Sequence, residues 1–123
     1  MKKIKLKPSL REKKHYLLIT ADSKNINLED IKERVKKAIL QFIGTLGYSK
    51  AGIVFPGIRE KEISDILEKN KMLILASNTD YVDHIKSSLI LYKDSENIEL
   101  KCIRVSGTLK KLKEFIEEVN EIK

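Results

Sequence analysis

The chain has 123 residues, 41% of them hydrophobic and 35% charged, and a formal net charge of +7. This length predicts one domain with a buried core, and no apolar run approaches the roughly 20 residues that cross a bilayer. The single cysteine, Cys102, excludes an internal disulfide. We expect a cytoplasmic protein with a small buried thiol and no secretory signal peptide.

The positive charge is concentrated in two short blocks. Residues 1–14 hold seven Lys or Arg against one acid, Glu12, and residues 100–113 hold five basic residues and no acid. Residues 1–14 show no hydrophobic periodicity, so we expect a basic N-terminal arm over 1–14 and a single domain over 15–123. Such local excess indicates an anionic partner, whereas net charge alone is a weak argument.

Hydrophobic periodicity predicts four strands and three helices. In chain order they are a strand over 15–22, a helix over 27–46, strands over 51–55 and 72–76, a helix from 78 or 79, a strand over 98–105 and a helix over 108–122. Asn27 is the expected N-cap of the first helix, and Gly47 fits the position that ends it. Residues 58–71 fit either a helix or a hairpin.

This order of elements predicts an α+β fold. Two β-α-β halves on one antiparallel sheet give the ferredoxin-like α/β sandwich (βαββαβ), which RNA recognition motifs share, here with an added C-terminal helix and the basic arm. RNA recognition motifs stack bases on strand aromatics, and the strand over 98–105 has none. We therefore expect contacts with a phosphate backbone and not base stacking on the sheet.

The sequence offers no convincing catalytic or metal site. His15 and His84 lack a ligand-spaced cysteine or acid, and Ser106 does not lie in a nucleophile elbow. A glycine-rich loop for nucleoside phosphates is missing. Residues 20–27 contain neither the Arg nor the Gly that an acylphosphatase would need. We expect no catalytic residue, no metal ligand and no cofactor in the protein itself.

The last helix has its charges in the unfavourable order. Its first turns carry lysines and its last turns glutamates, which costs a few tenths of a kcal/mol per charge. An anion bound at the helix start would offset that cost, and residues 106–108 supply backbone N–H groups for a phosphate. Two alternatives to anion binding stay open. The order of charges in this helix can be without function, and the basic arm over 1–14 can be a tail that only increases solubility.

The candidate polyanion-binding residues come from both basic blocks. They are Lys2, Lys3, Lys5, Lys7, Arg11, Lys13, Lys14, Ser106, Gly107, Thr108, Lys110, Lys111 and Lys113. Lysine predominates among them, which suits point-charge contacts with phosphates better than bidentate reading of bases.

Two segments resemble one known family. Residues 7–16 (KPSLREKKHY) resemble the N-terminal signature of archaeal ribonuclease P protein component 2, a relative of a eukaryotic ribonuclease P and MRP subunit. Residues 105–113 (VSGTLKKLK) resemble that family's strand-to-helix junction. His15 stands where the family usually has Arg, and residues 56–71 look longer than the family's usual link.

The resemblance implies a non-catalytic subunit of an endoribonuclease that removes the 5′ leader of precursor tRNA. In that family the RNA subunit performs the hydrolysis with bound Mg²⁺, and the protein candidates above would bind that RNA. It also implies a TIM-barrel-like protein partner and a homodimer within a two-plus-two assembly. The competing interpretation is a ferredoxin-like interaction domain, or a regulatory domain that binds a small anion at residues 106–108.

Overall fold

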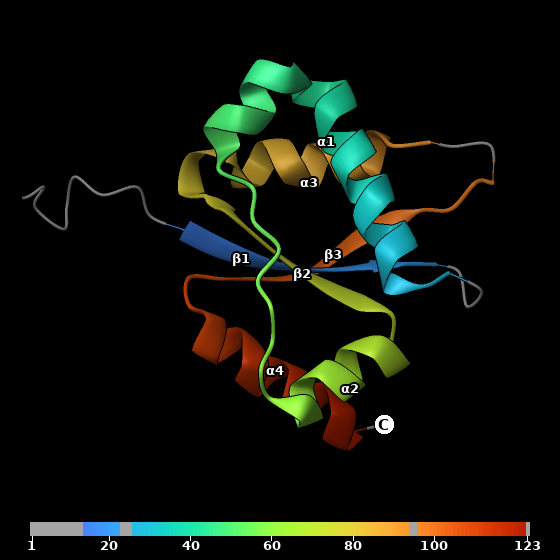
Figure 1. Cartoon of the computed structure of the whole chain (residues 1–123), viewed down its shortest axis with the longest axis vertical. Coiled ribbons are helices and arrows are strands. Elements are labelled where there is room, and N and C mark those ends of the chain that lie inside the picture. The colour runs from blue at the N-terminus through green and yellow to red at the C-terminus, as the bar shows by residue number, and fades with distance from the viewer. Residues whose placement is uncertain (1–13, 23–25, 94–95, 123) are drawn as a thin grey trace, which may run out of the picture.

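The computed structural model describes residues 14–22, 26–93 and 96–122, so the expected arm lies outside the described residues apart from Lys14. The elements are β1 (Lys14–Ala21), α1 (Leu28–Ala51), α2 (Lys61–Lys69), β2 (Met72–Asn78), a short 3-10 turn η2 (Thr79–Tyr81), α3 (Val82–Leu91), β3 (Leu100–Ser106) and α4 (Leu109–Ile122) (Figure 1). None of the helices in this described part is long and apolar enough to cross a membrane.

The three strands form one antiparallel sheet in the order β2-β1-β3. β1 is the central strand, and its apolar run Leu17-Leu18-Ile19 is fully buried. An unbroken apolar run suits a strand that is covered on both faces. The strand expected over 51–55 is wrong in extent: only Val54 pairs, through one bridge to Ala76 on the outer side of β2. α1 occupies the chain as far as Ala51, and Pro56, which cannot donate to a ladder, stops any extension.

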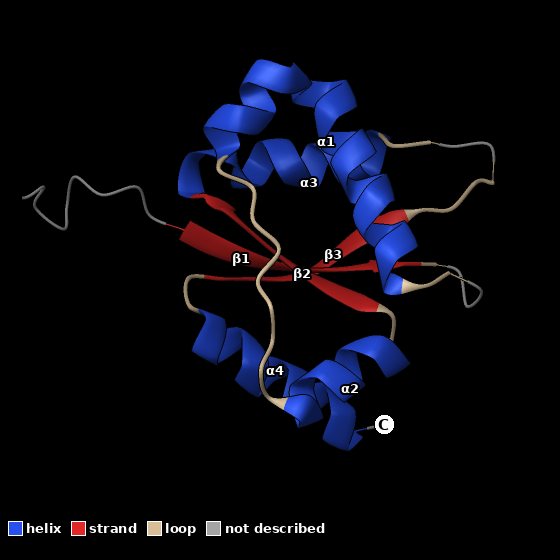
Figure 2. Cartoon of the chain, viewed as in Figure 1, coloured by secondary structure: helices blue, strands red, loops and turns tan. Residues whose placement is uncertain are grey.

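Helices cover both faces of the sheet (Figure 2). α1 and α3 lie on one face, and α2 and α4 lie on the other. The three strands, with the single bridge at Val54 in place of a fourth strand, follow the ferredoxin-like order. The layer of α2 and α4 is added to that fold. Residues 58–71, for which a helix and a hairpin were both expected, contain α2, with Ile63 and Leu67 buried. Within the described residues, both faces of the sheet are thus packed against helices.

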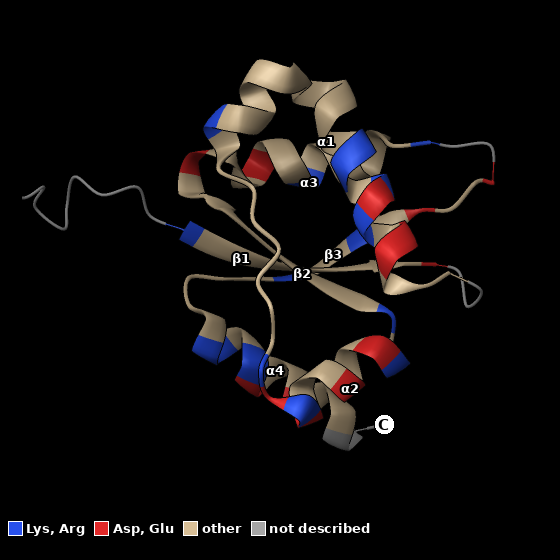
Figure 3. Cartoon of the chain, viewed as in Figure 1, with Lys and Arg blue, Asp and Glu red and all other residues tan. Residues whose placement is uncertain are grey.

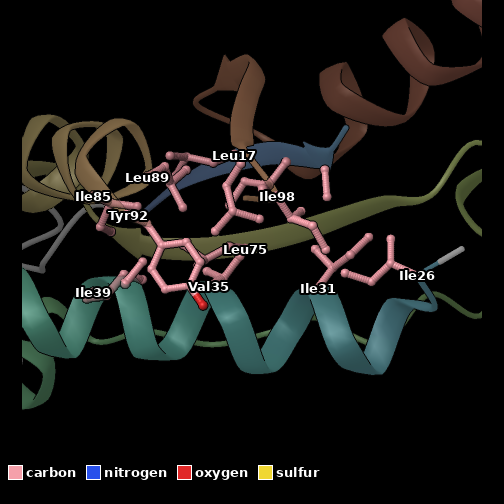
Figure 4. Close-up of a cluster of buried hydrophobic side chains, with 14 residues drawn as sticks. Leu17, Ile26, Ile31, Val35, Ile39, Leu75, Ile85, Leu89, Tyr92 and Ile98 are labelled. Carbon is pink, nitrogen blue, oxygen red and sulfur yellow. The ribbon is translucent and has the colours of Figure 1, made fainter. Parts of the chain in front are cut away.

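Alternate residues of β1 face the two helical layers. Leu17 and Ile19 belong to the core under α1 and α3, and Leu18 belongs to the smaller core under α2 and α4. In the larger core, Ile31, Val35 and Ile39 of α1 point toward the sheet (Figure 4). Their three- and four-residue spacing puts them on one stripe of the helix, which is why the sequence predicts α1 so clearly.

The start of α1 agrees with the prediction, and its end does not. Asn27 is the N-cap, and its Oδ1 accepts the Asp30 N–H at 2.8 Å. The helix does not end at Gly47. The chain breaks helical geometry at Gly44 (φ 74°, ψ 177°), resumes, and ends at Gly52 in the left-handed conformation (φ 61°). Burial of Ala51 holds this extra stretch against the core.

Candidate nucleic-acid interface

β1, which directly follows residues 1–13, begins beside the second basic block at one end of the sheet. Tyr16 in β1 pairs with Ser106 in β3, which brings the beginning of β1 beside the turn that leads into α4. His15 lies between the neighbouring elements: its Nδ1 is 2.7 Å from Thr79 Oγ1, and its Nε2 is 3.9 Å from where a Cβ on Gly107 would lie. The starts of η2 and α4 therefore converge where residues 1–13 join the domain.

The turn into α4 is organised by its own side chains. Thr108 caps the helix, since its Oγ1 accepts the Lys111 N–H at 3.2 Å and its carbonyl accepts the Leu112 N–H at 3.3 Å. The Thr108 N–H donates to Ser106 Oγ at 3.3 Å, so it is not free as the sequence suggested. Within the described residues, the backbone N–H groups of Leu109 and Lys110 have no acceptor, and these two are open to an anion.

The three lysines of α4 differ in their surroundings. Lys110 and Lys111 are exposed, and in the described part of the chain neither forms an ion pair. Lys113 instead donates to both carboxylate oxygens of Glu60, at 2.8 and 2.9 Å. This hydrogen bond lowers the pKa of Glu60. Figure 3 shows the basic start of α4 on the same side of the view as the beginning of β1.

Lys14 is occupied by a contact within the fold. Its Nζ donates to the Gly52 carbonyl at 2.7 Å, and Asn78 Nδ2 donates to the Lys50 carbonyl at 2.9 Å. Both contacts satisfy carbonyls at the end of α1, where the helix dipole is negative. Lys14 therefore anchors the end of α1 to the sheet. The other arm candidates, Lys2, Lys3, Lys5, Lys7, Arg11 and Lys13, lie outside the described residues.

One basic residue that was not among the candidates stands beside α4. Arg104, on the edge strand β3, places its Cζ 4.8 Å from the centre of the Phe115 ring. The sequence shows Arg104 within the second basic block. Helical periodicity assigns Phe115 to a buried stripe but does not reveal which strand residue lies against its ring, so the pair could not be identified from the sequence.

Among the described residues, the other reactive side chains do not gather into a metal site, and the one thiol is partly buried. Among residues 14–22, 26–93 and 96–122, no three His, Cys, Asp or Glu side chains gather as a metal site would require. Cys102 is partly buried, and desolvation raises the pKa of its thiol. A raised pKa keeps the sulfur protonated at neutral pH and therefore a poor nucleophile.

An apolar groove runs between α1 and α3, on the opposite side of the sheet from α4. It is flanked by Phe42 and Leu91, which are 44% and 62% exposed. Leu46 and Ile90 on the same two helices are exposed as well. Large apolar side chains gathered on one surface commonly mark a protein-binding site. We call the surface formed by Phe42 and Leu91 at this groove the α1–α3 apolar surface.

Comparison with known proteins finds one family. The model of the Rpp14/Pop5 family matches residues 10–117. Ribonuclease P protein component 2 of Methanocaldococcus jannaschii is 33% identical over 115 residues, covering 88% of this chain and 75% of the relative. The protein of that name from Pyrococcus furiosus is 32% identical over 111 residues, covering 88% of this chain and 86% of the relative.

A solved structure supports the fold. A chain in the cryo-EM structure of yeast ribonuclease MRP matches with a TM-score of 0.54 at 14% identity, covering 90% of this chain and 94% of that chain. At this identity the likeness concerns the arrangement of helices and strands.

Proposed function

The chain belongs to the Rpp14/Pop5 family, and from that premise we propose that it is a protein subunit of ribonuclease P, acting in removal of the 5′ leader from precursor tRNA. Relatives named ribonuclease P protein component 2 match most of its length. In this proposal the protein contributes no catalytic residue. The RNA subunit performs the phosphodiester hydrolysis and binds the Mg²⁺ ions.

The observation that carries the RNA-binding part of the proposal is that β1 begins beside the turn into α4, where the second basic block lies. Tyr16 and Ser106 pair at the sheet end where residues 1–13 join the domain and α4 begins. Lys110, Lys111 and the open N–H groups of Leu109 and Lys110 lie at the same end. Positive charge and unpaired N–H groups at a helix start suit a phosphate.

Phosphate binding explains how such a subunit would assist a catalytic RNA. Each phosphate neutralised by Lys or Arg releases condensed counterions, and that release favours binding at moderate salt. Screening of several phosphates also lets RNA helices pack closely at lower Mg²⁺ concentration. The effect would thus be on RNA folding and not on the chemical step.

We further propose that the α1–α3 apolar surface meets a protein partner. The family resemblance suggests a TIM-barrel-like subunit, with two copies of each chain in the assembly. Phe42 and Leu91 lie across the sheet from α4, so protein and RNA would occupy opposite faces without competing. Such an assembly would work in the cytoplasm, where precursor tRNA is processed in cells without a nucleus.

Reconstitution tests the proposal. Ribonuclease P RNA, the partner subunit and precursor tRNA are combined with and without this chain at low Mg²⁺, and leader removal is measured. We expect the chain to lower the Mg²⁺ concentration needed for half-maximal cleavage. The double variant Lys110→Ala/Lys111→Ala should lose part of that effect, while Lys36→Ala/Lys37→Ala on α1 removes the same charge as a control. Unchanged cleavage on omission of the chain would refute the proposal.

A further inference from the structure

We propose that Arg104, held over the Phe115 ring, is a second phosphate-binding element that extends the RNA surface from the start of α4 along the β3 edge. This inference rests on the RNA-binding function proposed above and adds a residue and a binding mode to it. Three observations support it: the strand geometry that places Arg104, the aromatic support of its guanidinium, and the absence of a carboxylate partner in the described part of the chain.

A β-bulge places Arg104 on the α4 side of the sheet. Ile19 pairs with Cys102, and without an irregularity Leu18 would pair with Ile103. The register shifts between these positions, so Leu18 pairs with Arg104. Leu18 belongs to the core under α2 and α4, and the extra residue, Ile103, is 44% exposed. Bulges re-aim side chains at sheet edges, and here the bulge brings a guanidinium to the side of α4.

The Phe115 ring supports the guanidinium without using its hydrogen-bond donors. Arg104 Cζ lies 4.8 Å from the ring centre, within the range of a cation–π contact. Phe115 is itself held, because it packs against the core under α2 and α4. A guanidinium carries five N–H groups in a fixed fork. Positioned by the ring, the fork loses less conformational freedom when it binds an anion.

The charge of Arg104 is not neutralised within the described residues. No carboxylate forms an ion pair with it there, whereas Arg34 on α1 pairs with Glu96 at 3.0 Å. Arg104 is solvent-exposed. Lys111 stands one helical turn before Phe115 and so lies on the same stripe of α4. A guanidinium fork and an ammonium therefore neighbour each other on one edge of the molecule.

An RNA backbone phosphate fits this arrangement better than a base. The guanidinium covers the Phe115 ring, which is therefore not a bare platform for stacking. A fork of parallel N–H donors matches two oxygens of one phosphate. Lys111 would add a point charge to a neighbouring phosphate. Most protein contacts with nucleic acids go to the phosphate backbone. The contacts proposed above for the start of α4 are also with phosphates.

The test uses the full chain and a transcript of ribonuclease P RNA in a filter-binding titration over several salt concentrations. Arg104→Lys keeps the charge but removes the fork, and Arg104→Gln removes both. We expect Arg104→Lys to weaken binding about tenfold, because one charge-assisted hydrogen bond of the bidentate pair is lost. Arg104→Gln should also reduce the slope of log K against log salt by about 0.7–0.9. Arg34→Lys, on α1 at the other face of the sheet, is the control and should change affinity less than twofold.

Phe115→Leu provides an independent arm, since it keeps an apolar side chain against the core but removes the ring. We expect it to weaken RNA binding as much as Arg104→Lys while retaining the circular dichroism of the folded protein. If Phe115→Leu does not fold, the surface variants of Arg104 still decide the question. Wild-type affinity in Arg104→Lys would overturn the bidentate contact. Failure of the wild-type chain to bind the RNA at all would instead overturn the proposed function, and this inference with it.

Discussion

His15 and Gly107 face each other at the end of the sheet, with the His15 Nε2 3.9 Å from the position that a Cβ on Gly107 would take. The residues are far apart in the chain and are brought together because Tyr16 pairs with Ser106. His15 also reaches Thr79 at the start of η2. The described end of the first segment that carries the family resemblance, residues 14–16, thus lies beside the second segment, residues 105–113.

Replacing Gly107 by Ala separates binding from folding. Gly107 does not have a positive φ, and the added methyl group would make an ordinary van der Waals contact with His15. We expect the free energy of unfolding to change by less than about 0.5 kcal/mol. RNA affinity should fall several-fold, because a methyl group would stand where a phosphate approaches the helix start. Urea unfolding and filter binding measure the two quantities.

Gly57→Ala is the matched control for this prediction. A Cβ at Gly57 would meet nothing within 4 Å, and its φ is not positive either. This variant should leave both stability and RNA affinity unchanged. Equal RNA affinity in the two alanine variants would place the phosphate away from the turn into α4.

Lys14 is expected to matter for stability and not for RNA. Lys14→Met keeps most of the aliphatic stem but loses the 2.7 Å hydrogen bond from Nζ to the Gly52 carbonyl. We predict a loss of about 1.5–3 kcal/mol in the free energy of unfolding, as for a hydrogen bond from a charged donor. The salt slope of RNA binding should stay the same, since this ammonium already has a partner. A reduced salt slope would show that Lys14 leaves Gly52 to contact the RNA.

The fold was largely predictable because periodicity reports burial. The stripe of Ile31, Val35 and Ile39 indicates α1, and the unbroken run of β1 indicates a central strand. The errors fall where one residue type serves two roles. Gly47 looks like a helix terminator, yet the backbone that needs a glycine is at Gly44 and Gly52, both with positive φ. A sequence pattern does not distinguish a glycine inside a helix from one that ends it.

The candidate surface was predictable in outline and not in detail. Charge clustering identifies both basic blocks, but it does not reveal which charges are already paired. Lys113 has Glu60 as its partner, and Lys14 has the carbonyl of Gly52. Both pairings join residues far apart in the chain, so they depend on tertiary structure. Arg104 was not identified as a binding residue for the same reason, since the Phe115 ring that supports it belongs to another element.

Lys113 should contribute less to RNA binding than its neighbours. Its ammonium is held by Glu60, whereas Lys110 and Lys111 have no ion pair in the described residues. We expect Lys111→Ala to reduce the salt slope of RNA binding by about 0.7–0.9 and Lys113→Ala to reduce it by clearly less. Equal reductions would mean that Lys113 exchanges Glu60 for an RNA phosphate.

The pair of Lys113 and Glu60 should also show a characteristic pH dependence. The hydrogen bond from Lys113 lowers the pKa of Glu60 in the folded protein below its ordinary value of 4.5. The pair therefore stabilises the folded state above that value, and the contribution is lost as the pH falls through the lowered pKa. Thermal unfolding should separate wild type from Lys113→Ala at neutral pH but not at strongly acidic pH. Because the pair is exposed, the separation should be small. A difference that persists in acid would assign the effect to packing of the lysine stem.

The α1–α3 apolar surface is expected to govern assembly with protein. Phe42→Ser/Leu91→Ser removes the two side chains that flank the groove. Since Leu91 is largely exposed and Phe42 is about half exposed, unfolding should become easier by only about 1–2 kcal/mol. Affinity for the TIM-barrel-like subunit should fall at least tenfold, as for central apolar residues of an interface. Isothermal titration calorimetry of the two purified proteins measures this affinity.

Ile103→Ser is the matched control, because Ile103 on the β3 edge is 44% exposed, as Phe42 is. Normal affinity in the double variant and a loss in Ile103→Ser would move the protein interface to the edge strand, beside Arg104, and bring protein and RNA onto the same face.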